Sequence, residues 1–176
     1  MHKRKMLILG MASILLFSGM LTAAAVIPPP PGVESDLIAG QDWDHPVGTL
    51  VVDHEDGDRY LFITYNTIDG WEITETHLAM ALSLDGIPHT NSGNPKVGKF
   101  PYTHPAVSEP TQVEYIIDLN DFPSLNHDGY YSGTVFIAAH AVVQNPECGS
   151  ETAWADTISQ PFPGNNWALY FTITLE

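Results

Sequence analysis

Glu75 and His77 interrupt an otherwise apolar, β-type segment, and their residue types and spacing are suited to chemistry. They lie two positions apart in WEITETHLAMAL, so on an extended strand both side chains project from one face. His140 interrupts a second apolar segment, TVFIAAHAVV, in the same way. If these segments are neighbouring strands, the two imidazoles and the carboxylate converge. Glu151 or Asp156 could then reach the cluster from the segment that follows.

This cluster allows three interpretations. Two imidazoles and a carboxylate suit a transition metal, or a general base with the group that orients it. The third interpretation is a structural hydrogen-bond network, since buried polar groups are nearly always paired. We favour the network, because the chain has no His-x-His or His-Glu-x-x-His spacing. A metal-dependent enzyme centred on His77 and His140 stays an alternative.

No residue is assigned a catalytic role. The chain has no Gly-x-Ser-x-Gly motif, and Cys148 has acidic neighbours that disfavour a thiolate. As the only cysteine, it also leaves the domain without an internal disulfide. Nothing in the spacing therefore supports nucleophilic catalysis.

A second candidate site is the acidic turn DHEDGD, which contains Asp53, Glu55, Asp56 and Asp58. Crowded carboxylates outside the cell commonly bind calcium, which takes six to eight oxygen ligands. The spacing is not that of an EF-hand loop, and a solvated Asp56-Gly57 turn explains the motif without an ion. Calcium is therefore the cofactor that this turn suggests, the transition metal at His77 and His140 stays an alternative, and any other cofactor is unknown.

A third candidate is a carbohydrate-binding surface, because tryptophan rings stack on sugar rings. Trp43 and Trp154 fall in segments that we expect to be loops, so they are the candidates for glycan contact. Trp71 follows a turn and Trp167 fits a core pattern, so we expect both to pack inside the domain.

The first residues predict export. A basic cap, an apolar stretch and Ala23-Ala24-Ala25 form a secretory signal over residues 1–25. Cleavage would leave Arg59, Lys96 and Lys99 against all 21 acidic residues. Such a surface repels nucleic acid and anionic membranes, whereas glycans, cations and basic partners stay compatible. We expect a secreted or cell-surface protein with no membrane contact beyond the signal.

Residues 26–35, VIPPPPGVES, predict a stiff proline-rich arm that could dock on another copy. Residues 36–176 then form one domain. Short segments of alternating polarity, separated by Asp-Gly turns, predict an all-β fold, an antiparallel two-sheet β-sandwich or jelly roll. We expect strands at 47–53, 60–65, 71–82, 113–119, 134–143 and 167–175. Two long loops, 85–111 and 144–166, complete the fold.

Within this fold the stretch around Asp69-Gly70 is expected to form a central hairpin of strands 60–65 and 71–82. Strand 60–65 has apolar residues on both faces, so we expect it to be covered on both.

Five blocks of the chain occur in the order of a known family: TYNTIDGWEITETHLAM, GNPKVGKFPYTH, IAAHAVV, SETAWAD and PFPGNNWALYFTI. From about Leu37 to the C-terminus the chain resembles an uncharacterised family of exported β-domain proteins of bacteria, archaea and some fungi. The resemblance implies a compact extracellular β domain with no assigned reaction. Its blocks contain the polar residues of the predicted network together with Trp154, and no catalytic or ligand residue is carried over.

Three functions follow as hypotheses. The first is a non-catalytic secreted or cell-surface domain, structural or adhesive, stabilised by calcium and self-associating through the arm. The second is an extracellular carbohydrate-binding module. The third is the metal-dependent enzyme. They differ most simply in whether His77 and His140 meet in an open cleft or in a closed interior.

Overall fold

The computed structural model describes residues 32–105, 111–157 and 160–176 as an all-β protein. The strands are β1 (Val33–Ala39), β2 (Gly48–Asp53), β3 (Tyr60–Thr67), β4 (Glu72–Ala81), β5 (Tyr102–Pro105), β6 (Gln112–Asp118), β7 (Asn126–His127), β8 (Tyr130–Tyr131), β9 (Gly133–Asn145), β10 (Gly149–Asp156), β11 (Gln160–Pro161) and β12 (Leu169–Leu175). Four short 3-10 helices join them: η1 (Leu84–Gly86), η2 (Val97–Lys99), η3 (Leu119–Asp121) and η4 (Pro123–Leu125). No helix in the described part of the chain is long and apolar enough to span a membrane.

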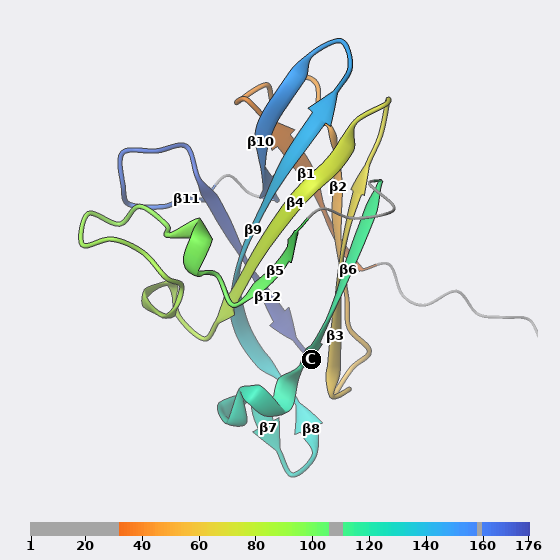
Figure 1. Ribbon diagram of the computed structural model, residues 1–176. Helices are drawn as coiled ribbons and strands as arrows, with labels where there is room; N and C mark the ends of the chain where they lie inside the picture. The colour runs from red at the N-terminus through yellow and green to blue at the C-terminus, as the bar shows by residue number, and fades with distance from the viewer. Residues whose placement is uncertain (1–31, 106–110, 158–159) are drawn as a thin grey trace, which may run out of the picture.

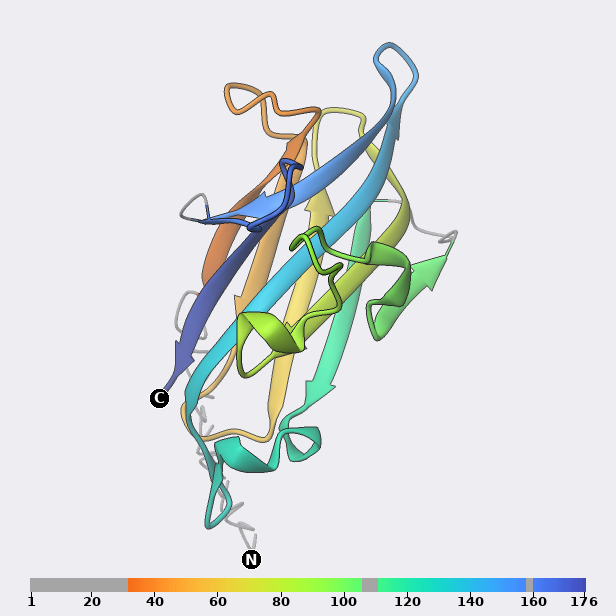
Figure 2. The same ribbon diagram turned by 90° about the vertical axis from the view of Figure 1, so that its left-hand side faces the viewer.

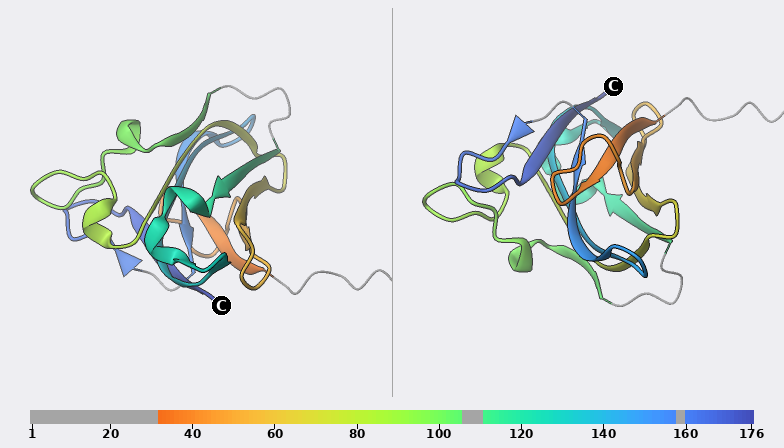
Figure 3. Two further views of the ribbon diagram at one scale, coloured as in Figure 1. Left: turned by 90° about the horizontal axis from the view of Figure 1, so that it is seen from below. Right: turned by 90° about the horizontal axis from the view of Figure 1, so that it is seen from above.

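Ten of the strands form one antiparallel sheet that curls into a nearly closed barrel (Figure 1). Around it the order is β5, β4, β9, β10, β1, β2, β3 and β6. The 13-residue strand β9 pairs with β4 along one edge, and with β12 and then β10 along the other. Viewed from either end, the strands surround a common interior (Figure 3). The pairing gives one curled sheet, so the expected division into two sheets is not confirmed.

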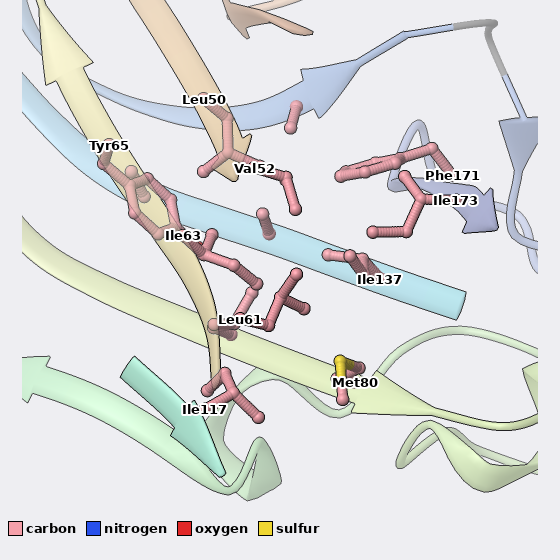
Figure 4. Close-up of a cluster of buried hydrophobic side chains, with 14 of the residues drawn as sticks. Leu50, Val52, Leu61, Ile63, Tyr65, Met80, Ile117, Ile137, Phe171 and Ile173 are labelled. Carbon is pink, nitrogen blue, oxygen red and sulfur yellow. The ribbon is translucent and has the colours of Figure 1, made fainter. Parts of the chain in front are cut away.

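Alternate residues of the strands point into this interior and form the main hydrophobic core. On β3 these are Leu61, Ile63 and Tyr65, each with no exposed area. Figure 4 shows them converging with residues from the strands around the ring: Leu50, Val52, Met80, Ile117, Ile137, Phe171 and Ile173. Period-two alternation thus fixes which face of each strand is inside.

Side-chain hydrogen bonds close the ring between β6 and β4. The hydroxyls of Tyr115 and Thr76 lie 2.7 Å apart, and Thr76 is fully buried. The Tyr65 hydroxyl crosses the interior and donates to the carbonyl of His77 at 3.2 Å. These side-chain bonds join β6 and β3 to β4, where β4 and β6 are not paired through their backbones.

A second hydrophobic cluster lies outside the ring, on the outer face of β4, β9 and β10. The segment from Leu82 to Pro101 folds back over this face, as Figure 2 shows. Small outward residues on the strands, among them Ala79 and Ala138, let the segment pack closely. Ile87 and Phe100 come from this segment, and Phe162 and Ala168 come from the segment before β12. Two loops therefore cover one outer face of the sheet.

The Asp69-Gly70 turn forms, but the expected hairpin is wrong. Both residues have positive φ, 52° and 78°, which is typical of a tight reversal. However, β3 pairs with β2 and β6, and β4 pairs with β5 and β9. Both edges of β3 are already paired, so β4 cannot pair with it. The turn instead carries the chain to another part of the ring.

The turn at Asp56-Gly57 does connect two paired strands, β2 and β3, and the turn at Asp128-Gly129 connects β7 and β8. Strand β3 is covered on one face only, because Tyr60 on its outer face is 37% exposed. The expectation that both faces are covered is therefore wrong.

Two predicted boundaries change. Strand β1 begins at Val33, so residues 33–35 of the expected arm belong to the sheet. The rest of the arm up to residue 31, the signal segment and residues 106–110 of the expected loop 85–111 lie outside the described residues. The expected loop 144–166 contains β10, a strand with six residues paired to β9 and four paired to β1. Its inward residues Ala153 and Ala155 are small, which hid the alternation.

Candidate functional site

The structure brings His77 and His140 together as direct neighbours. They are paired across β4 and β9, and Trp154 is paired with His140 across β9 and β10. All three side chains project from the outer face of the sheet, so they form a row across three strands. The His77 and His140 ring centroids lie 5.7 Å apart, and those of His140 and Trp154 lie 4.8 Å apart in an edge-on contact.

The row is closed to solvent. His77, His140 and Trp154 are 9%, 7% and 5% exposed. The Phe100 ring packs against the Trp154 ring from the segment 82–101, and the Phe162 ring packs against it from the segment 160–168. The row therefore lies in a closed interior beneath the two covering loops, not in an open cleft.

Glu75 connects the row to the surface. Its Oε1 lies 3.0 Å from Nε2 of His77, and its side chain is 45% exposed. The Nδ1 atoms of His77 and His140 are buried, and no described residue forms a hydrogen bond with them. Burial lowers the pKa of His140 to about 4, and the adjacent imidazole of His77 adds to this effect. The His140 ring is therefore neutral at physiological pH and packs mainly as an apolar body.

Glu151 is not part of the row. It lies on β10 three residues before Trp154, so its side chain points to the opposite face of the sheet. There it lines a pocket at the end of the barrel. Asp156 does share the outer face, where it accepts a hydrogen bond of 2.9 Å from the indole N–H of Trp43.

The acidic turn is part of the β2–β3 connection. His54 contacts the carbonyl of Asp58 through Nε2 at 2.9 Å, and the Asp58 carboxylate accepts from the backbone N–H of Arg59 at 2.6 Å. Within residues 32–105, 111–157 and 160–176, no group of three or more His, Cys, Asp or Glu side chains is arranged to hold a metal ion.

The two candidate tryptophans differ. Trp43 is 48% exposed in the β1–β2 connection, as expected for a contact residue. Trp154 lies in a strand, and its ring faces are covered by protein side chains. Trp154 cannot offer a stacking surface to a sugar in this arrangement.

Among the residues that cover the row, sequence reasoning missed Ile87 and Phe162. Ile87, Phe100 and Phe162 lie in proline-rich segments without a regular period. The available signal was the apolar outer face of β9, where Phe136 and Ala138 accompany His140. An apolar face on an interior strand requires a cover.

Comparison of the chain with protein-family models, with curated proteins and with solved structures gives no match.

Proposed function

We propose that this chain is a non-catalytic, exported β domain that acts as a structural or adhesive unit at the cell surface. The observation that carries the proposal is the burial of the His77–His140 pair beneath two loops. A catalytic imidazole must reach a substrate, and these rings instead contact each other and Trp154. The basic-apolar-small pattern of the first residues supports export.

In this proposal the row braces the molecule. Trp154 contacts His140 within the sheet and a phenylalanine from each covering loop. The row thus joins three strands to both loops without a disulfide. Stability of the covered face then comes from packing, which suits an exported domain with a single cysteine.

The test is the effect of metals on thermal stability. Purified full-length protein is melted with and without Zn²⁺, Cu²⁺ or Mn²⁺, alongside a His140→Phe variant of similar shape. We expect no rise in melting temperature that depends on His140. A metal that stabilises the wild type but not the variant would indicate a metal centre, because a ligand selective for the native state must stabilise it. That result overturns the proposal.

Calcium belongs to the same series. If the acidic turn binds calcium, millimolar calcium raises the melting temperature, and Asp56→Asn reduces the rise. Glu147→Gln removes one carboxylate from the exposed β9–β10 connection and serves as the control. An unchanged melting temperature discards the calcium part and leaves the rest of the proposal standing.

A carbohydrate-binding module is the second candidate, and Trp43 is the observation that favours it. Its ring is 48% exposed while the hydrogen bond to Asp156 holds the indole. A glycan array with wild type and Trp43→Ala tests this function. Binding that is lost in the variant supports it, and an array without hits removes it.

A further inference from the structure

A pocket of about 410 Å³ lies at one end of the barrel, away from the His77–His140 row. Four segments form it: the end of β1, the β1–β2 connection, the β3–β4 turn and the β9–β10 hairpin. These segments come together at the top of Figure 1. The lining residues are Ala39, Gly40, Asp42, His45, Val47, Trp71, Cys148 and Glu151. The volume falls within the range of small-molecule sites, which often lie in the mouths of β-barrels.

The pocket combines an apolar base with hydrogen-bond acceptors. Ala39 and Val47 are buried at 6% and 3% exposure, and Trp71 packs against the main core beside them. Asp42 and Glu151 add two carboxylates, and the lining contains no lysine or arginine. The base can therefore hold alkyl carbons, while the carboxylates need a donor.

The pocket lining has few hydrogen-bond donors, and one of them is already engaged within the lining. Nδ1 of His45 lies 3.1 Å from one carboxylate oxygen of Asp42. The Glu151 carboxylate has no hydrogen bond or ion pair to any described residue. The carboxylate lies close to Gly40, where a Cβ would be 3.3 Å from Glu151 Oε2. The pocket thus presents an unneutralised acceptor beside apolar surface, in a chain of net charge −15.

We propose that this pocket binds an alkylammonium group. An ammonium offers donors and no acceptor, which complements the two carboxylates. Its methylenes pack on Val47 and Trp71, and the positive charge is attracted by the indole face. An anionic ligand is repelled, and a sugar, whose hydroxyls also need donors, is matched less well. The inference goes beyond the proposed function and does not depend on the buried row.

The same chemistry has two sources, a free alkylamine and the side chain of a lysine in a partner protein. The test titrates ¹⁵N-labelled full-length protein with n-butylamine, 1,5-diaminopentane and a short lysine-containing peptide at constant ionic strength. We expect shifts at Gly40, Val47 and the Trp71 indole, with a Kd on the order of 1 mM for butylamine. Tighter binding of the peptide identifies a protein lysine, and tighter binding of the diamine identifies a free amine.

Matched charge variants separate the pocket from general attraction to an acidic protein. Glu151→Gln and Asp42→Asn each remove one carboxylate from the pocket, and we expect each to weaken butylamine binding about fivefold or more. Glu147→Gln removes the same charge from the same hairpin outside the pocket and should have little effect. All three positions are exposed, so folding is expected to be intact.

Four results overturn the inference. The first is the absence of shifts at tens of millimolar butylamine. The second is equal weakening by Glu147→Gln and Glu151→Gln, which indicates unspecific attraction. The third is equal binding of tetramethylammonium, which has the charge without the donors. The fourth is binding of glucose to the same residues with the amines inactive, which indicates a sugar site. None of these results bears on the metal test of His140.

Discussion

Two regions of the outer face of this barrel differ in their exposure to solvent, although they belong to one sheet. On β4, β9 and β10 the outward residues include Ala138, His140 and Trp154, and two loops cover them. On β3 and β6 the outward residues include Tyr60 and Ile116, which are 37% and 58% exposed. The difference teaches that a histidine on the apolar face of a strand is better evidence that other segments cover this face than that the residue is catalytic.

The largest expected effect breaks the covered face. Trp154→Ala removes the ring that contacts both loops and His140, so we expect it to lower the free energy of unfolding by about 3–5 kcal/mol. Ile116→Ala on the bare face should change it by no more than about 0.5 kcal/mol. Urea denaturation measures both. Similar losses for the two variants would contradict the distinction between the faces.

The cover itself is tested by Ile87→Ala. Ile87 has no exposed area and belongs to the segment over the sheet, so we expect a loss of about 2–4 kcal/mol. Hydrogen exchange should become faster across residues 82–101. Leu82→Ala is the control, because Leu82 is 40% exposed in the same segment. Unchanged exchange in Ile87→Ala would show that the segment is not held by this packing.

The pH dependence of stability comes next. The pKa of His140 is about 4 in the folded state and about 6.5 when unfolded, so between these values the unfolded state binds more protons. Stability therefore falls as the pH falls from about 6.5 to about 4, by up to about 3 kcal/mol. Glu75 and His77 face this region from β4, and Trp154 faces it from β10.

His140→Phe isolates the contribution of His140. The variant keeps a ring in place and cannot titrate there, so we expect a flatter profile than that of the wild type over this pH window. At neutral pH the variant should be as stable as the wild type or more so, because the unpaired Nδ1 is removed. Superimposable wild-type and variant profiles would argue against a buried neutral His140.

The smallest expected effect lies at the border of the covered face. Glu75→Gln removes the carboxylate whose Oε1 lies 3.0 Å from Nε2 of His77, but the Glu75 side chain is 45% exposed. Pairs accessible to solvent contribute about 0–1 kcal/mol, so we expect a loss in this range that decreases with added salt. Denaturation at low and high ionic strength measures it. A loss comparable to that of Trp154→Ala would make the Glu75–His77 contact, not the aromatic packing, the main source of stability at this face.

Local patterns predicted much of this fold. The alternation around Val113, Ile117 and Leu119 gave the buried face of β6 and the residue that follows it, because each inward residue is large and apolar. The pattern failed for β10, where Ala153 and Ala155 carry little hydrophobic signal. It also failed at Asp69-Gly70. The turn there reverses the chain, but long-range packing decides which strands pair with the two edges of β3.

The candidate sites show the same limit. The spacing of two residues predicted that Glu75 and His77 share a face of one strand. In the structure, the pairing of β4 with β9 places His140 beside His77. Glu151 can reach the cluster only from a loop; it lies on β10 instead, and strand geometry turns its side chain to the other face. The pocket with Asp42, His45 and Trp71 could not be predicted, since its residues meet only when four separate segments fold together.

The central claim is that His140 lies neutral in a closed interior, and its titration tests this most directly. The His140 imidazole resonances of the full-length chain are followed by NMR from neutral pH to about pH 3, with His140→Phe used for assignment. The structure predicts a midpoint near 4. A midpoint near the ordinary value of about 6.5 would show an imidazole open to water and would contradict the claim.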